Sequence, residues 1–287
     1  MTRKNDVGLG DTYELEHPFY AHVVSPYSNL TRLNVRNDLQ SKERLFVVGD
    51  VHGCVNELSE LLTKLNYQPE KDQVILAGDL TAKGPDSRGV IRLAQEMGLL
   101  CVRGNHDDQV IRFKTYENVH GVQGAKTGEV VNEGNVMDPI KFGDEHDTIA
   151  RNMTQEEYDF LVGCPLIMEL PFMNARVVHA GLDPNISDLP KNDPWTVLNI
   201  RNVRKGVPIA ANHQGTHWTE FWTEAQNKTS PLIIYYGHDA ARGLDLETDT
   251  FGLDSRCVYG GELSALELHT HQLTQIKCKA YTKTPFR

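Results

Sequence analysis

The chain has 287 residues, of which 39% are hydrophobic and 24% are charged, and its formal net charge is −10 at pH 7. This length and balance are typical of a folded enzyme and exclude a disordered chain. No run of about 18 or more apolar residues occurs, so we expect no membrane segment, and the negative charge disfavours stable binding to nucleic acid.

The first half of the chain predicts alternating strands and helices after a polar N-terminal arm, residues 1–40. A β-branched run over 44–50 predicts a buried strand, and leucines at helical spacing over 58–65 predict a helix after it. A second buried strand is predicted over 73–79, and a second helix over 86–97. Two strand–loop–helix units therefore follow the arm.

A third apolar run, 99–107, also ends in polar residues. Three strand–loop–helix units in succession predict βαβ crossovers and a parallel or mixed sheet. In such sheets, binding sites form beyond the carboxyl ends of the strands. The polar residues that follow the three strands are therefore expected to converge.

The second half contains an irregular segment and then several more strands. Residues 115–150 are rich in Gly and charge and predict a long insertion loop, which could cover the site or be partly ordered. Thr154 to Glu157 form a capping box for a helix that continues to Val162. Further strands are predicted within 165–170, 175–181, 231–239 and 264–278. No domain boundary is visible, so residues 41–287 are expected to form one domain.

Cysteines and sequons bear on the compartment of the protein. The absence of a Cys-x-x-Cys pair argues against a zinc–thiolate cluster, and buried free thiols are expected, with one disulfide left open, for Cys54, Cys101, Cys164, Cys257 and Cys278. Asn-x-Ser/Thr sequons are more numerous than the about two expected by chance, and they begin at Asn29, Asn152, Asn185 and Asn227. This excess favours a lumenal protein.

Five short motifs place Asp, Asn or His directly after apolar runs. In Gly-Asp-Val-His-Gly, Asp50 and His52 offer a carboxylate and an imidazole to one divalent cation. In Gly-Asp-Leu-Thr-Ala-Lys-Gly, the two oxygens of Asp79 can bridge to a second cation. The motifs Gly-Asn-His-Asp, His-Ala-Gly and Gly-His-Asp add Asn105, His179 and His238. Each motif alone also fits an ordinary turn or a structural histidine, but together they supply ligands suited to Zn, Mn, Fe or Co.

With these motifs in this order, the chain resembles the calcineurin-like metallophosphoesterases, and 251–268 resembles the C-terminal strands of their phosphoprotein phosphatase branch. The resemblance implies an α/β fold, a four-layer αββα sandwich of two mixed sheets, with the metal site at the strand carboxyl ends. It implies two divalent metal ions (Zn, Co, Mn or Mg), one held by Asp50, His52 and Asp79 and the other by Asp79, Asn105, His179 and His238. It also implies that His106 is the general acid and that a metal-bridging hydroxide attacks phosphorus in line.

The chain departs from the protein phosphatases at one motif. Those enzymes carry Asp-Arg-Gly where this chain has Ala82 and Lys83, so the carboxylate that orients the acid histidine is missing. Asp107 and Asp239 remain as alternative partners for His106. Lysine also replaces a bidentate guanidinium by a point charge. The Lys-Gly-Pro form instead resembles the ApaH-like phosphatases, which act on phosphoanhydride bonds, and a protein Ser/Thr phosphatase becomes the weaker interpretation.

The substrate remains open among polyanionic phosphates. A resemblance to fungal vacuolar endopolyphosphatases implies internal cleavage of inorganic polyphosphate in the vacuole lumen, with the cytoplasm as the alternative compartment. Polyphosphate would need cationic side chains, and the candidates are Lys83, Arg201 and Arg242, together with Arg204 and Lys205. Dinucleoside polyphosphate or mRNA-cap hydrolysis would need an aromatic platform, for which the candidates are Trp218, Trp222 and Tyr116. A metal-binding scaffold without activity is the non-enzymatic alternative.

Overall fold

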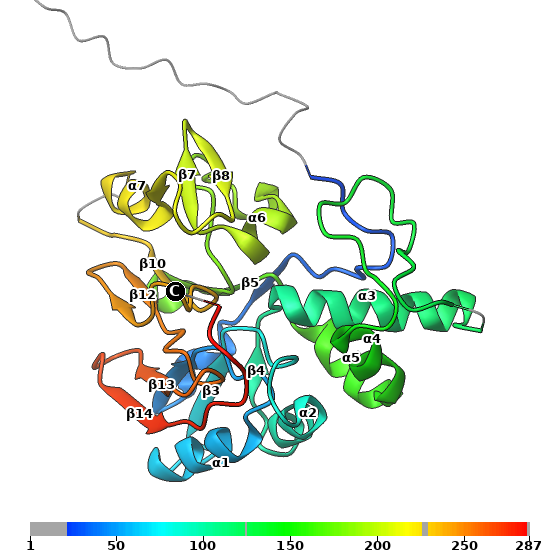
Figure 1. The fold of residues 1–287 in the computed structure, drawn as a ribbon. Coiled ribbons are helices and arrows are strands. Elements are labelled where there is room, and N and C mark those ends of the chain that lie inside the picture. Colours follow the sequence, from blue (N-terminus) through cyan, green and yellow to red (C-terminus); the bar gives the residue numbers. More distant parts are fainter. Residues whose placement is uncertain (1–21, 124, 226–228, 286–287) are drawn as a thin grey trace, which may run out of the picture.

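Two mixed sheets with helices on their outer faces form the body of the computed structural model (Figure 1). The structure describes residues 22–123, 125–225 and 229–285. Most of the expected arm lies outside the described residues, but its end forms β1 (Leu33–Val35), which pairs in parallel with β5 (Ile167–Leu170). The last part of the arm is thus an edge strand.

The first sheet contains the three predicted strand–loop–helix units. Strands β2 (Arg44–Val48), β3 (Asp72–Leu76) and β4 (Leu100–Cys101) run parallel, as the sequence predicted. The hairpin β13 (Glu262–Glu267) and β14 (Leu273–Lys277) extends the sheet on the β2 side in antiparallel pairing. The three parallel strands therefore direct their carboxyl ends to one edge.

The second sheet gathers strands from distant parts of the chain. Its order is β1, β5, β6 (Ala175–Val178), β10 (Ile233–Tyr236), β12 (Thr250–Gly252) and β11 (Asp245–Leu246). Strand β10 is parallel to both β6 and β12, while β5 and β11 pair antiparallel with their neighbours β6 and β12. The sheet is mixed, and β6 and β10 lie side by side near its centre.

Alternation along β2 shows how the layers are built. Leu45 and Val47 point into the core between the two sheets, whereas Phe46 and Val48 point into the core beneath the helices. A strand that is buried on both faces must be apolar at every position, which explains the continuous run. A third core covers the outer face of the second sheet. The expected four-layer αββα arrangement is confirmed.

The outer layers are helical. The first sheet is flanked by α1 (Val55–Lys64), α2 (Ser87–Glu96) and α5 (Gln155–Gly163). The predicted capping box lies at the N-terminus of α5. The second sheet is covered by α6 (Pro194–Asn199) and α7 (Trp218–Ala225). Next to them lies a small sheet of β7 (Asn202–Arg204), β8 (Val207–Ile209) and β9 (Thr216–His217). Among the described helices, none has the length and apolarity needed to cross a membrane.

The insertion at 115–150 is more ordered than the expected loop. Helix α3 (Asn105–His120) runs into it, and α4 (Glu145–Asn152) begins before it ends. Between them, the carboxylate of Glu133 lies 3.2 Å from the guanidinium of the buried Arg112 and also accepts a hydrogen bond from the Ile140 amide. Arg112 pairs further with Asp138 at 2.8 Å. These ion pairs, of which the one with Glu133 is buried, tie the insertion to α3, a tertiary contact that sequence periodicity does not reveal.

The cysteine prediction was wrong in number. Disulfides join Cys101 to Cys164 and Cys257 to Cys278, and only Cys54 is a free, buried thiol. The first links β4 to the end of α5, and the second fastens the segment after β14 to the loop before β13. Both partners of each pair are far apart in sequence, so spacing alone could not assign them.

The disulfides should stabilise the fold measurably. Replacing Cys101 and Cys164 by Ala should lower the free energy of unfolding by about 2–4 kcal/mol, because the bridge closes a long loop in the unfolded chain. Urea denaturation with and without reductant measures this loss. The Cys54→Ala variant is the control and should respond to reductant as the wild type does. An unchanged wild-type midpoint under reduction would contradict the prediction.

Candidate metal centre

The six predicted ligands lie at the carboxyl ends of strands from both sheets. Asp50 and Asp79 follow β2 and β3 of the first sheet, and Asn105 is the first residue of α3, just after β4. His179 and His238 follow β6 and β10 of the second sheet. The centre therefore forms where the strand ends of the two sheets meet, as expected for such a sheet edge.

Asp79 lies between two groups of ligands. Its Oδ2 is 3.4 Å from Nε2 of His52, and its Oδ1 is 3.4 Å from Nε2 of His179. Asp50 lies near both sides: its Oδ2 is 3.7 Å from the same Nε2, and a carboxylate oxygen of Asp50 lies within 4.8 Å of ligand atoms of Asp79 and His179. The two oxygens of Asp79 thus point to different partners, which is the arrangement that a bridging ligand requires.

Asn105 completes the second group. Its Oδ1 lies 3.0 Å from Nε2 of His179 and 3.1 Å from Nδ1 of His238. The structure thus brings all six residues together as two groups that share Asp79. Their role as metal ligands remains a prediction.

Backbone carbonyls orient two of the imidazoles. Nδ1 of His52 lies 3.0 Å from the Thr81 carbonyl, and Nδ1 of His179 lies 2.8 Å from the Ala77 carbonyl. A carbonyl can only accept, so each Nδ1 carries a proton, and Nε2 is the nitrogen that faces the centre and could bind a cation once it is unprotonated. This is how proteins prepare histidine as a metal ligand.

The electrostatics of the site fit a bound cation. Asp50 Oδ2 and His238 Nε2 are buried and have no hydrogen-bond partner among the described residues. Burial raises the pKa of Asp50 well above its usual range, with nearby Asp254 adding to the effect. Burial would lower the pKa of His179, but the Asp79 carboxylate outweighs it and raises the pKa to about 9. Raised pKa values of this kind mean that the enclosed carboxylates favour added positive charge, which a divalent cation could supply in place of protons.

Strained backbone conformations at the centre bring the side chains of the predicted ligands close together. His52, Asp79 and His238 have φ values of 45°, 49° and 70°, in the left-handed region that non-glycine residues rarely adopt. Gly237 is required by close approach, since a Cβ there would lie 2.1 Å from Oδ1 of Asp50. That oxygen instead accepts a 2.8 Å hydrogen bond from the amide of His238.

His106 has a partner that the sequence analysis missed. Asp107 is engaged elsewhere, since it accepts hydrogen bonds from Thr81 and from the Gly104 amide. Asp239, the other alternative, lies 3.6 Å from both Arg201 and Arg242. Both alternatives were therefore wrong.

Nδ1 of His106 lies instead 2.8 Å from Nε2 of His146, in the insertion. His146 stands in an aperiodic segment forty residues further along the chain. No motif in the sequence pointed to it.

The predicted substrate residues lie around the centre at different depths. Nζ of Lys83 is 3.0 Å from Nε2 of His52, one of the predicted metal ligands. Arg201 donates to the carbonyl of His238 at 3.4 Å, and the exposed Arg242 flanks the same loop. Arg204 pairs with Gln214 on the outer small sheet. Lys83 and Arg201 are thus the cations placed next to the predicted ligands.

The aromatic platform expected for a nucleotide is not formed by the two tryptophans. Trp218 is 0% exposed and Trp222 6% exposed, and both belong to the core outside the second sheet. Tyr116 packs edge-on against Tyr27 and Phe142. The prediction that Trp218 or Trp222 could stack on a base was wrong, because α7 turns both rings inward.

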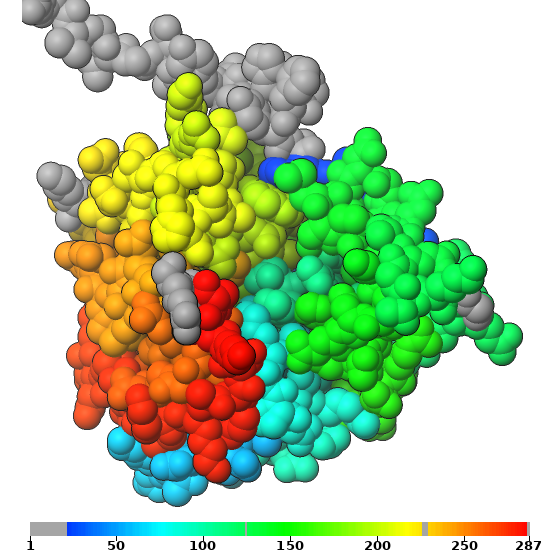
Figure 2. All heavy atoms as spheres, in the orientation of Figure 1, coloured from blue at the N-terminus to red at the C-terminus, as the bar shows by residue number. Residues whose placement is uncertain are grey.

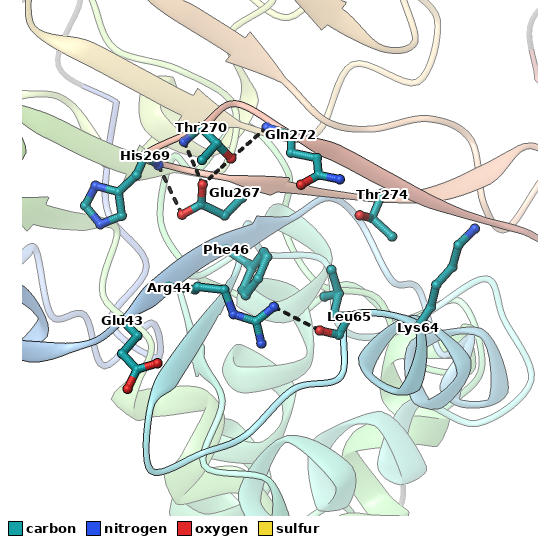
Figure 3. A pocket seen from close by; sticks show the side chains of 10 residues that line it. All are labelled: Glu43, Arg44, Phe46, Lys64, Leu65, Glu267, His269, Thr270, Gln272 and Thr274. Atoms are coloured by element: carbon teal, nitrogen blue, oxygen red, sulfur yellow. Dashed lines mark hydrogen bonds between the residues drawn. The ribbon is translucent and has the colours of Figure 1, made fainter.

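A pocket at the opposite end of β2 offers no comparable chemistry. It lies between the β13–β14 hairpin and α1 (Figure 3). Its polar groups serve the local backbone: Arg44 donates to the Leu65 carbonyl, and Glu267 accepts from the amides of His269 and Thr270. Since the local backbone satisfies the hydrogen-bonding capacity of these groups, the strand-end centre remains the candidate functional site.

Comparison with known proteins agrees with the geometry. Residues 43–273 match the family model described as calcineurin-like phosphoesterase. A zinc-dependent endopolyphosphatase of Saccharomyces cerevisiae is 27% identical, with 93% of this chain and 91% of that protein covered.

Two further relatives carry a different name. An asymmetrical bis(5'-nucleosyl)-tetraphosphatase of Halalkalibacterium halodurans is 30% identical, with 77% of this chain and 88% of that protein covered. The crystal structure of a putative diadenosine tetraphosphatase superposes with a TM-score of 0.71 at 27% identity, covering 87% of this chain and 99% of the other.

The bridging position can be tested with one substitution. Asp79→Asn should remove the charge that both groups share, so we expect loss of bound metal and a fall in phosphohydrolase activity of at least about 100-fold. Elemental analysis of the purified protein and kcat/KM measure the two effects. Asp86→Asn is the matched control, because the Asp86 side chain caps α2 through the Gly89 amide and otherwise forms a 3.8 Å ion pair with Arg92, and Asn caps helices equally well. Full activity in Asp79→Asn would refute the ligand set.

Proposed function

Because the chain belongs to the calcineurin-like phosphoesterase family, we propose that it is a phosphoanhydride hydrolase that cleaves inorganic polyphosphate internally. The observation that carries the proposal is Lys83, whose Nζ reaches to 3.0 Å from Nε2 of His52. A lysine is a compact point charge that suits any phosphate oxygen, without the planar geometry that arginine demands. The similarity to an endopolyphosphatase over nearly the whole chain supports this substrate.

The chain's own residues divide the work as follows. The family uses two divalent cations, which when bound polarise the phosphoryl group and activate water. Lys83, Arg201 and Arg242 hold the phosphates on either side of the scissile bond. His106 is the general acid that gives a proton to the leaving oxygen. Its amide donates to Oδ1 of Asp79 at 3.0 Å, which fixes the acid next to the predicted bridging ligand.

Hydrolysis of a dinucleoside polyphosphate is the second candidate. The tetraphosphatase relative and the superposed tetraphosphatase structure favour it. A nucleotide would add base stacking to the phosphate contacts, but Trp218 and Trp222 are buried and cannot supply it. A protein Ser/Thr phosphatase is less favoured, since Ala82 and Lys83 replace the Asp-Arg pair of that branch.

We also propose that the protein works in an oxidising, lumenal compartment such as the vacuole. Two disulfides form in the described chain, and such bonds persist where thiols are not kept reduced. Among the sequon residues, Asn29, Asn152 and Asn185 are exposed, so N-linked glycans could be accommodated there, and Asn227 lies outside the described residues.

The substrate proposal predicts a specific product pattern. Incubation with long-chain polyphosphate should yield progressively shorter chains on a gel, because cleavage occurs within the polymer. The kcat/KM ratio should favour polyphosphate over diadenosine tetraphosphate by about 10-fold or more, since discrimination follows this ratio. The Asp79→Asn protein is the inactive control. Release of free phosphate without shortened intermediates, or preference for the dinucleotide, would reject endopolyphosphatase activity.

The compartment proposal predicts glycosylation. The protein isolated from its own cells should lose mass on enzymatic N-deglycosylation, because exposed sequons are modified during secretory transport. A variant with Asn29, Asn152 and Asn185 replaced by Gln should show a smaller loss or none. A mass that deglycosylation leaves unchanged in the wild type, together with five alkylatable thiols, would place the protein in a reducing compartment instead.

A further inference from the structure

His106 is held by a second histidine rather than by a carboxylate. Its Nδ1 lies 2.8 Å from Nε2 of His146, and the two rings stack with centroids 5.1 Å apart and an interplanar angle of 18°. The His146 side chain is 13% exposed, so water competes little for this contact. We propose that His146 is a positioning residue that orients the general acid His106, in place of the carboxylate that Ala82 lacks. This inference rests on the proposed function.

The insertion places His146 through contacts on both sides of it. Asp144 caps α4 by accepting from the Asp147 amide at 3.0 Å. Glu145 contacts the loop that follows β3, where its Oε1 accepts a 2.7 Å hydrogen bond from the Lys83 amide. Asp144 therefore caps α4, while Glu145 and His146 contact the site. In Figure 2 the green surface of this region borders the cyan surface of the preceding part of the chain.

Asp144 selects the useful tautomer of His146. Its Oδ2 lies 3.6 Å from Nδ1 of His146, which is too far for a hydrogen bond, but its negative charge still favours a proton on that nitrogen, which has no hydrogen-bond partner among the described residues. Nε2 of His146 then presents a lone pair, which can accept only if Nδ1 of His106 donates. This leaves Nε2 of His106 as the nitrogen that faces away from His146 and serves the reaction. Such chains of acid and imidazole fix ring orientation in other catalytic and metal sites.

The proton balance of the step follows directly. As the oxygen of water bonds to phosphorus, the bond from phosphorus to the leaving oxygen breaks. His106 acts in its doubly protonated form: Nε2 gives its proton to that oxygen while Nδ1 keeps its own, and the proton released by water restores Nε2 through solvent. His146 keeps its protons throughout and acts only by holding the His106 ring. A leaving group that is a weak base needs little of this help, whereas a strong base needs it fully.

The hydrogen bond itself can be observed without substrate. In the metal-loaded, ¹⁵N-histidine-labelled protein, NMR should show a downfield imidazole proton on Nδ1 of His106, assigned with the His106→Gln variant. His146→Ala should abolish this signal and Asp144→Asn should shift it, whereas His120→Ala should leave it unchanged. His120 is the matched control, because in the described part of the chain its side chain contacts the Tyr27 hydroxyl and the rings of Tyr27 and Tyr116, away from the centre. A signal that survives in His146→Ala would overturn the proposal.

Kinetics with two leaving groups distinguishes positioning from mere support of the fold. His146→Ala should lower kcat for phenyl phosphate, whose leaving group is a strong base, by about 10- to 100-fold, with KM and metal content unchanged. For p-nitrophenyl phosphate, whose leaving group is the weaker base, the loss should be smaller than about 3-fold. His146→Gln, which keeps an acceptor near the same place, should recover part of the loss.

The outcomes separate this inference from the proposed function. An active wild type with an equally active His146→Ala variant overturns the positioning role alone. Equal losses on both aryl phosphates, accompanied by loss of metal, also overturn it, because they assign His146 a purely structural role. A metal-loaded wild type that hydrolyses none of the phosphate compounds overturns the proposed function and this inference with it.

Discussion

The buried Asp79 carboxylate is the constraint on which the rest of the site depends. Its Oδ1 accepts from the His106 amide and faces His179, while its Oδ2 faces His52. The neighbouring histidines, led by His179, keep its pKa well below the usual range although burial opposes this. A charge enclosed in this way is costly unless positive groups surround it. The other five predicted ligands and the proposed acid His106 are therefore grouped around one carboxylate.

The fold provides this arrangement by bringing the ends of two sheets together. Hydrophobic burial between the sheets fixes β3 against β6 and β10, and the left-handed residues that follow the strands turn their side chains into the same space. Such conformations cost of order 1–3 kcal/mol each and persist only where surrounding packing determines them. The sandwich core therefore stabilises a site that the local sequence alone would not adopt.

The difference between local pattern and long-range packing explains which parts of the site and the fold could be predicted from the sequence. Asp50, Asp79, His179 and His238 each follow an apolar run, so local pattern and the geometry of parallel strands were sufficient to group them. His146 follows no such run, and its approach depends on tertiary ion pairs such as Arg112 with Glu133. The disulfides and the inward orientation of Trp218 also depend on long-range packing. Periodicity reports burial along one element, but it does not report which distant element comes into contact.

The contact between His106 and His146 of the insertion changes how the absence of the Asp-Arg pair is interpreted. In this chain, Ala82 and Lys83 adopt φ values of 68° and 63°, and the Lys83 amide is held by Glu145, the residue next to His146. The start of α4 thus contacts both the proposed acid His106 and Lys83, which lies beside the predicted ligand His52. With the roles proposed above, a change in the insertion would alter leaving-group protonation and phosphate binding together. The proposed positioning role of His146 would then take the place of the carboxylate that position 82 lacks, and it would make the insertion part of the site.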